Sequence, residues 1–217
     1  MSDPQTGPAI MKFGFLAVAA LAIAAGLYAF FAPTGNPVSV AGGQCALNEA
    51  TRTALNNAAT GEVAAFQVVD QPSSVASLSF NDKDGKPTSL AAWKGRTVLL
   101  NLWATWCAPC RKEMPALDQL ERDLGGDGFQ VVPISLDLGT PEKPKAFYQQ
   151  IGLTDLPFFH DGSLESLTSL KKRSLAFGLP ATLLIDAKGC VLGALNGPAE
   201  WASDDAKALI NTVLTKQ

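Results

Sequence analysis

The 217-residue chain has little charge, one histidine and four cysteines, and each shortage excludes a class of protein. Its 17 Lys and Arg residues are outnumbered by 20 Asp and Glu, so no basic surplus is available to neutralise a nucleic-acid backbone, and we expect no nucleic-acid partner. Four cysteines are too few for a small scaffold built on disulfides. No internal repeat is evident, and the length favours one well-packed domain with an appendage.

One long apolar run lies near the N-terminus. Residues 13–32, FGFLAVAALAIAAGLYAFFA, carry no charge, and a helix of this length spans roughly 30 Å of hydrocarbon. The alternative is a cleavable signal peptide, but the run ends in YAFFAP, which is a poor cleavage site. The nearby basic residue, Lys12, orients the N-terminus inward. We therefore predict a single-pass anchor in the inner (cytoplasmic) membrane, with residues 1–12 cytoplasmic and the catalytic part in the periplasm, where disulfides persist.

The segment after the anchor changes character twice. Residues 33–60 begin with a tether rich in Pro, Gly and small residues, PTGNPVSVAGGQ, and continue with a short amphipathic helix over 46–58. A charged Asp-Gly turn between apolar ends over 78–90 then predicts a hairpin or strand-turn. We assign residues 61–217 to one folded domain.

The folded domain alternates strands with helices. The predicted elements are a strand over 97–103, a helix over 109–124, a strand over 129–136, a helix over 141–153, a short apolar stretch at 156–159, a helical run over 164–177, a hairpin over 181–195 and a helix over about 200–214. Alternation predicts a parallel start to the sheet, and the hairpin adds antiparallel strands, so the fold class is α/β with a mixed central sheet flanked by helices. Because Pro133 lacks a ladder donor, we expect its strand to lie at an edge or to bulge there.

The motif NLWATWCAPCRKEMP places two cysteines where a buried strand runs into a helix. Unpaired N–H groups and the positive end of the helix dipole favour a thiolate at a helix start, so Cys107 is the predicted nucleophile. Cys110, one turn further on, is the predicted resolving thiol. Trp106 is expected to shield one side of the pair. Half of a zinc site is the alternative, but with His160 as the one histidine and no second C-x-x-C, we expect neither metal nor cofactor.

Three further residues have two interpretations each. Glu113 lies about one helical turn after Cys110, where a buried carboxylate could transfer protons and an exposed one would only interact with the helix dipole. Cys45 and Cys190 are predicted to form a structural disulfide that contributes up to roughly 5 kcal/mol by closing a long loop. Two unpaired buried thiols are the alternative for that pair.

From about residue 61 to the end, the chain resembles the thioredoxin superfamily. More narrowly, WATWCAPCRKEMP, the Leu-Pro of FGLPATLL, the N-terminal anchor and the lone cysteines are similar to the TlpA family of bacterial membrane-anchored thioredoxins. The resemblance implies a cis Pro180 against the cysteine pair, beside backbone that binds a partner peptide; an ordinary strand-start proline is the alternative. It also implies that Glu113 lies near the pair, as in cytochrome-maturation relatives. Ordinary thioredoxins have a buried aspartate where this chain has Asn101, a departure that argues against their mode of proton transfer.

The same resemblance implies a protein-disulfide reductase that keeps exported cysteine pairs in the thiol state. Its expected clients are a copper chaperone or cytochrome oxidase subunit, or proteins of cytochrome c maturation, because metal loading needs free thiolates. A membrane electron donor would recharge the cysteine pair. The alternatives are a disulfide-forming oxidase and a non-catalytic metal-binding assembly module.

Overall fold

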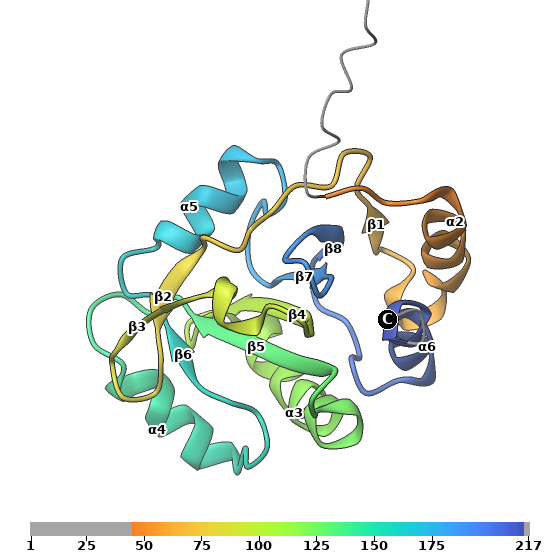
Figure 1. Cartoon of the computed structure of the whole chain (residues 1–217). Helices are drawn as coiled ribbons and strands as arrows, with labels where there is room; N and C mark the ends of the chain where they lie inside the picture. Colours follow the sequence, from red (N-terminus) through yellow and green to blue (C-terminus); the bar gives the residue numbers. More distant parts are fainter. Residues whose placement is uncertain (1–44, 215–217) are drawn as a thin grey trace, which may run out of the picture. The chain divides into compact units, whose positions relative to one another are not determined.

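Eight strands form one mixed sheet in the described part of the chain, residues 45–214 of this computed structural model (Figure 1). The predicted cytoplasmic segment 1–12, the predicted anchor 13–32 and the predicted tether that follows it lie outside these residues. Within residues 45–214, no helix is both long and apolar enough to cross a membrane. The described residues all belong to one compact unit of the chain.

Two parallel strands, β4 (Thr97–Trp103) and β5 (Phe129–Ser135), occupy the centre of the sheet. Every residue of β4 is buried, because core clusters cover both faces of the sheet. The strand is accordingly apolar except for Thr97 and Asn101. Helix α3 (Ala108–Leu124) connects the two strands. The predicted strand-helix-strand order is confirmed, with bounds that differ by at most one residue.

The sheet has the strand order β1-β8-β7-β4-β5-β6-β2-β3. The strands outside the centre are β1 (Gln67–Val68), β2 (Ser79–Asn81), β3 (Pro87–Ser89), β6 (Phe159–His160), β7 (Ala181–Ile185) and β8 (Val191–Asn196). Both predicted hairpins are confirmed, since β2 pairs antiparallel with β3 and β7 with β8. β7 also pairs antiparallel with β4, which makes the sheet mixed, as predicted.

Helices surround this sheet (Figure 1). Besides α3, the described helices are α2 (Glu49–Ala58), α4 (Glu142–Ile151), α5 (Glu165–Lys172), α6 (Asp204–Leu214) and the 3-10 turns η1 (Gly61–Val63) and η2 (Leu90–Trp93). The predicted short helix before the folded domain is confirmed as α2. Its N-cap Asn48 accepts a hydrogen bond from Thr51 N at 2.8 Å, and its fully buried Leu55 joins the core beside α6.

Alternate residues of β4 point to opposite faces of the sheet. Leu99 and Trp103 join the core cluster that contains α3 and α6 side chains, whereas Leu100 joins the cluster on the α5 side. Asn101 therefore faces α3. Thr182 of β7 is its direct cross-strand partner and faces the same way. This alternation brings two polar side chains beneath the helix that carries the cysteine pair.

Pro133 does not have the position expected for it. β5 lies between β4 and β6, and its register with β4 runs without a shift through the pair Asn101↔Pro133, so the predicted edge or bulge is wrong. Leu136 N–H donates to Trp103 O at 2.8 Å, and alternate residues of a strand direct their backbone groups to opposite sides. The nitrogen of Pro133 is therefore directed toward β6, whose pairing with β5 covers only residues 134 and 135. No ladder bond is lost there.

Candidate active site

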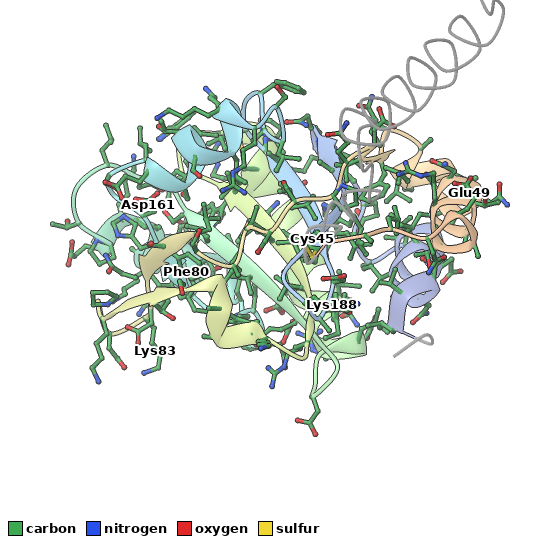
Figure 2. The ribbon with its side chains drawn as sticks, turned by 45° about the horizontal axis from the view of Figure 1, so that its top comes forward. Cys45, Glu49, Phe80, Lys83, Asp161 and Lys188 are labelled. Carbon is green, nitrogen blue, oxygen red and sulfur yellow. A yellow bond between two sulfur atoms is a disulfide. The ribbon has the colours of Figure 1, made fainter. Side chains whose placement is uncertain are left out.

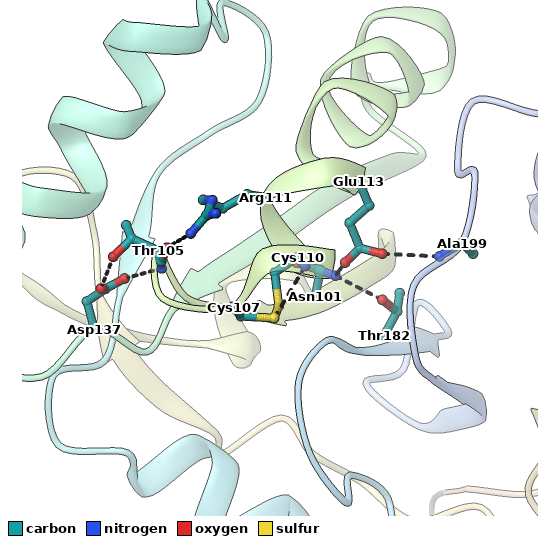
Figure 3. The surroundings of a disulfide bond; sticks show 9 residues. All are labelled: Asn101, Thr105, Cys107, Cys110, Arg111, Glu113, Asp137, Thr182 and Ala199. Atoms are coloured by element: carbon teal, nitrogen blue, oxygen red, sulfur yellow. Dashed lines mark hydrogen bonds between the residues drawn. A yellow bond between two sulfur atoms is a disulfide. The ribbon is translucent and has the colours of Figure 1, made fainter.

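The predicted cysteine pair is a disulfide at the start of α3, with an S–S distance of 2.04 Å (Figure 3). Cys107 is the N-cap of the helix, and its Sγ accepts a hydrogen bond from Cys110 N at 3.3 Å. Pro109 fits the first helical turn because it lacks an N–H that would have no partner there. Cys107 keeps 6% of its surface exposed, whereas Cys110 is fully buried. Any partner must therefore reach Cys107 first.

The residue just before the pair has an exposed aromatic side chain. Trp106, immediately before Cys107, is 61% exposed. The shielding role expected for Trp106 stays a prediction, because its ring lies largely in solvent. The Leu179–Pro180 peptide bond is cis, and Pro180 immediately precedes β7, the strand that pairs with β4.

A first polar cluster lies on the Cys110 side of the disulfide (Figure 3). Glu113 is buried, and its Oε1 accepts a hydrogen bond from Asn101 Nδ2 at 2.9 Å while its Oε2 accepts one from Ala199 N at 3.2 Å. Asn101 Nδ2 also donates to Thr182 Oγ1 at 2.9 Å. The cluster thus joins α3, β4, β7 and the loop after β8. Sequence reasoning named Glu113 and Asn101 but not Thr182 or Ala199.

Burial dominates the electrostatics of Glu113. Loss of solvation raises its pKa from the ordinary 4.5 to about 7, and the hydrogen bonds from Asn101 and Ala199 oppose that rise. The buried indole N–H of Trp201 also lowers the pKa of Glu113, although it lies outside hydrogen-bonding geometry with any described group. Glu113 also lines a surface pocket of about 220 Å³, together with Lys112 and Ala199 among others. A carboxyl group in this position can exchange a proton near neutral pH.

A second polar cluster lies on the Cys107 side (Figure 3). The buried Asp137 accepts hydrogen bonds from the backbone N–H of Thr105 at 2.9 Å, from the Thr105 hydroxyl and from Ser135 Oγ at 3.0 Å. Arg111 donates to Thr105 O at 2.6 Å. These contacts hold the loop that precedes Cys107. Sequence reasoning missed Asp137, although a polar residue just after a parallel strand is where α/β sheets place site residues.

His160 is buried in β6, and its ring makes no hydrogen bond to Cys107 or Cys110. Its Nε2 lies 2.7 Å from Asp137 O, so the ring supports the backbone beneath the second polar cluster. Within residues 45–214, no group of three or more His, Cys, Asp or Glu side chains is arranged to hold a metal ion.

Cys45 and Cys190 form the second disulfide, with an S–S distance of 1.97 Å. Figure 2 shows Cys45 beside Lys188, and Lys188 belongs to the turn that leads from β7 to β8. Cys190 is 1% exposed, and its N–H donates to Asp186 Oδ1 at 2.9 Å. The bond joins the residues just before α2 to this turn.

The fold and the site together define a thioredoxin-like protein. It has a mixed sheet, a disulfide at the start of α3 and a cis proline just before β7, the strand that pairs with β4. A family model described as Redoxin matches residues 63–210, more than half of the chain. The chain belongs to the Redoxin family.

Individual relatives agree with this result. The thioredoxin-like protein YneN of Bacillus subtilis is 32% identical over 116 residues, covering 52% of this chain. The thiol-disulfide oxidoreductase ResA of Bacillus thuringiensis subsp. konkukian is 33% identical over 116 residues, covering 54% of it. The chain spans 64% of the length of each of these two relatives.

A solved structure shows the same fold. A thiol:disulfide interchange protein of the thioredoxin family from Chlorobium tepidum is 28% identical, with a TM-score of 0.56, over 67% of this chain and 99% of that one. The resemblance that WATWCAPCRKEMP and the Leu-Pro indicate is confirmed: this is a thioredoxin-like chain of the TlpA/ResA type.

Proposed function

We propose that the chain is a thiol:disulfide oxidoreductase whose redox pair is Cys107 and Cys110. The observation that carries the proposal is the disulfide at the start of α3, where one sulfur is partly accessible and the other is enclosed. This asymmetry supports Cys107 as the group that attacks a partner and Cys110 as the resolving group. The names of the relatives, thiol-disulfide oxidoreductase and thiol:disulfide interchange protein, support the same chemistry.

In the reducing direction, the cycle starts with Cys107 as a thiolate, favoured by the N-terminus of α3. Its Sγ attacks one sulfur of a client disulfide, forms a mixed disulfide and releases the other client sulfur, which takes a proton from solvent. Cys110 then passes its proton to Glu113 and attacks Cys107 Sγ. The mixed disulfide breaks, the second client thiolate leaves, and the Cys107–Cys110 disulfide remains. The client gains the two electrons that the pair loses.

We further propose that the reaction runs as a reductase in the periplasm, with residues 13–32 as the membrane anchor. The charge-free length of that segment supports the anchor. By its resemblance to TlpA-like proteins, the chain would serve a copper chaperone, a cytochrome oxidase subunit or cytochrome c maturation, with a membrane protein as electron donor. Carbonate-washed membranes should retain the chain, and protease added to spheroplasts should digest it. Recovery in the soluble cytoplasmic fraction would contradict the anchor and the location.

The chemistry is tested by trapping. In the Cys110→Ser chain, the mixed disulfide with Cys107 cannot be resolved, so clients should be captured in complexes that dithiothreitol releases. The matched control is the chain with both Cys107→Ser and Cys110→Ser, which should capture none. Equal capture by both variants would indicate a non-catalytic assembly module.

The direction is tested by the reduction potential of the pair, measured by equilibrating the full chain with dithiothreitol or glutathione buffers. A value near roughly -270 mV or lower supports the reductase, and one near roughly -120 mV would make the chain a disulfide-forming oxidase.

A further inference from the structure

The polar cluster beside Cys110 contains a buried acceptor that none of its hydrogen bonds satisfies. Asn101 Nδ2 uses both of its hydrogens, one toward Glu113 Oε1 and one toward Thr182 Oγ1. Its carbonyl oxygen, Oδ1, is buried and has no hydrogen-bond partner among the described residues. Asn101 as a whole is 0% exposed, so solvent does not satisfy this acceptor. A buried acceptor without a donor is rare and calls for a functional explanation.

The state of the cysteine pair provides one. In the disulfide form, Cys110 carries no S–H, so it has no proton to donate. In the dithiol form, the fully buried Cys110 carries an S–H that needs an acceptor. Asn101 faces α3 from β4, and its amide touches Glu113, which follows Cys110 by one helical turn. Figure 3 shows the Asn101 side chain on the Cys110 side of the disulfide.

The two oxygens of Glu113 already take part in the hydrogen bonds of this cluster. Each already accepts a hydrogen bond, Oε1 from Asn101 and Oε2 from Ala199. Asn101 Oδ1 is the one oxygen of this cluster that accepts none. In addition, the ionised form of Glu113 fixes the orientation of the amide, because an amide rotated by 180° would direct Oδ1 at a carboxylate oxygen, which has no hydrogen to donate.

We propose that Asn101 is a positioning residue whose Oδ1 accepts the hydrogen bond of the Cys110 S–H in the dithiol form, while its Nδ2 holds Glu113 ready to receive that proton. This inference rests on the proposed function and deepens it. The proton of Cys110 lies on one end of the amide and its receiver lies on the other. In the resolving step, the S–H turns about the Cβ–Sγ bond of Cys110 from Asn101 Oδ1 to Glu113, and its proton moves to the carboxylate. The freed thiolate then attacks Cys107 Sγ, the mixed disulfide breaks, and the client sulfur leaves as a thiolate. Asn101 gains and loses no proton.

The test measures the hydrogen bond itself. In the full-length Cys107→Ser chain, with Cys45 and Cys190 joined, Cys110 is the sole thiol, so its Raman S–H stretching band reports one group. Adding Asn101→Leu should move this band to higher wavenumber, because a free S–H vibrates at higher frequency. The exchange of S–H for S–D in D₂O identifies the band. An unmoved band in a variant with unchanged circular dichroism would overturn the proposal.

Three further variants separate the possible acceptors. A band that moves with Glu113→Gln but not with Asn101→Leu would show that the thiol donates to Glu113, which also overturns the proposal. Thr182→Val should move the band less than Asn101→Leu, since it frees the amide without removing it. Ser135→Ala removes a buried hydroxyl on the Cys107 side and should leave the band in place, which controls for general loosening of the core.

A second measurement covers the case in which Asn101→Leu folds poorly. Asn101→Ser keeps a small polar group at the position, and the carboxyl carbon-13 shift of Glu113 should report a higher pKa there, because the donor to Oε1 is lost. An unchanged pKa of Glu113 in this variant contradicts the positioning role. Neither readout requires a client, so a chain that fails to reduce any disulfide would refute the proposed function while leaving this inference to be judged by the spectra.

Discussion

The two disulfides of this protein differ in the length of the loop that they close and in the residues around them. Cys107 and Cys110 are three residues apart at a helix start, with Glu113 buried next to the pair and the exposed Trp106 beside it. Cys45 and Cys190 are 145 residues apart. On the chain-entropy model, the short loop adds roughly 2 kcal/mol to stability and the long one up to roughly 5 kcal/mol. Loop length and neighbours, rather than the bond, separate an exchangeable disulfide from a structural one.

The largest difference expected between the two disulfides is in activity. Cys107→Ser should abolish reduction of a disulfide substrate, because no other described cysteine offers an accessible sulfur at a helix start. Turnover of a disulfide-linked fluorescent peptide measures it. The chain with both Cys45→Ser and Cys190→Ser is the comparison and should keep its turnover at a temperature where it is folded. If both variants were inactive, the two bonds would not differ in role.

The next largest effect is on stability. Here the Cys45–Cys190 disulfide is expected to matter more than the Cys107–Cys110 disulfide, the reverse of their effects on activity. Replacing Cys45 and Cys190 with Ser should lower the free energy of unfolding by up to about 5 kcal/mol, and replacing Cys107 and Cys110 should lower it by only about 2 kcal/mol. Guanidinium denaturation of each double variant, followed by tryptophan fluorescence, gives both values. Equal losses would show that loop length does not govern these bonds.

A third prediction concerns pH and the group beside the short disulfide. Because the folded pKa of Glu113 is raised to about 7 from 4.5, the folded chain binds its proton more tightly than the unfolded chain. Its contribution to stability is therefore complete below pH 4.5 and is lost as the pH rises through 7, by up to about 3 kcal/mol. Denaturation of the oxidised chain at pH 4.5, 6 and 8 measures this slope. Glu113→Gln should flatten it, and an equally steep slope in that variant would assign it to other groups.

The smallest effect is expected next to the long disulfide. Asn48 caps α2, the helix that follows Cys45, by accepting from Thr51 N. Asn48→Ala should lower the free energy of unfolding by about 1 kcal/mol and leave turnover unchanged. Asn48→Asp keeps the capping oxygen and is the matched control. A loss of turnover in Asn48→Ala alone would link this end of the molecule to the redox pair.

The parts of this protein that depend on neighbouring residues in the chain were predictable from sequence. The strand over 97–103, the helix after Cys107 and the C-terminal hairpin all follow from local periodicity and turn residues, and their bounds agree with the structure. The position of Pro133 in the sheet was not predictable from sequence, because whether a strand lies at an edge depends on which strands pair with it.

The candidate site divides in the same way. Sequence by itself determined the cysteine pair and its helix start, since both lie within one short motif and local backbone geometry dictates the unpaired N–H groups there. Only the tertiary structure decided that Glu113 is buried and that Asn101, Thr182 and Ala199 meet it, because these groups come from four separate segments. Burial and hydrogen bonds set the pKa of a carboxyl group, and both arise only when distant segments pack together.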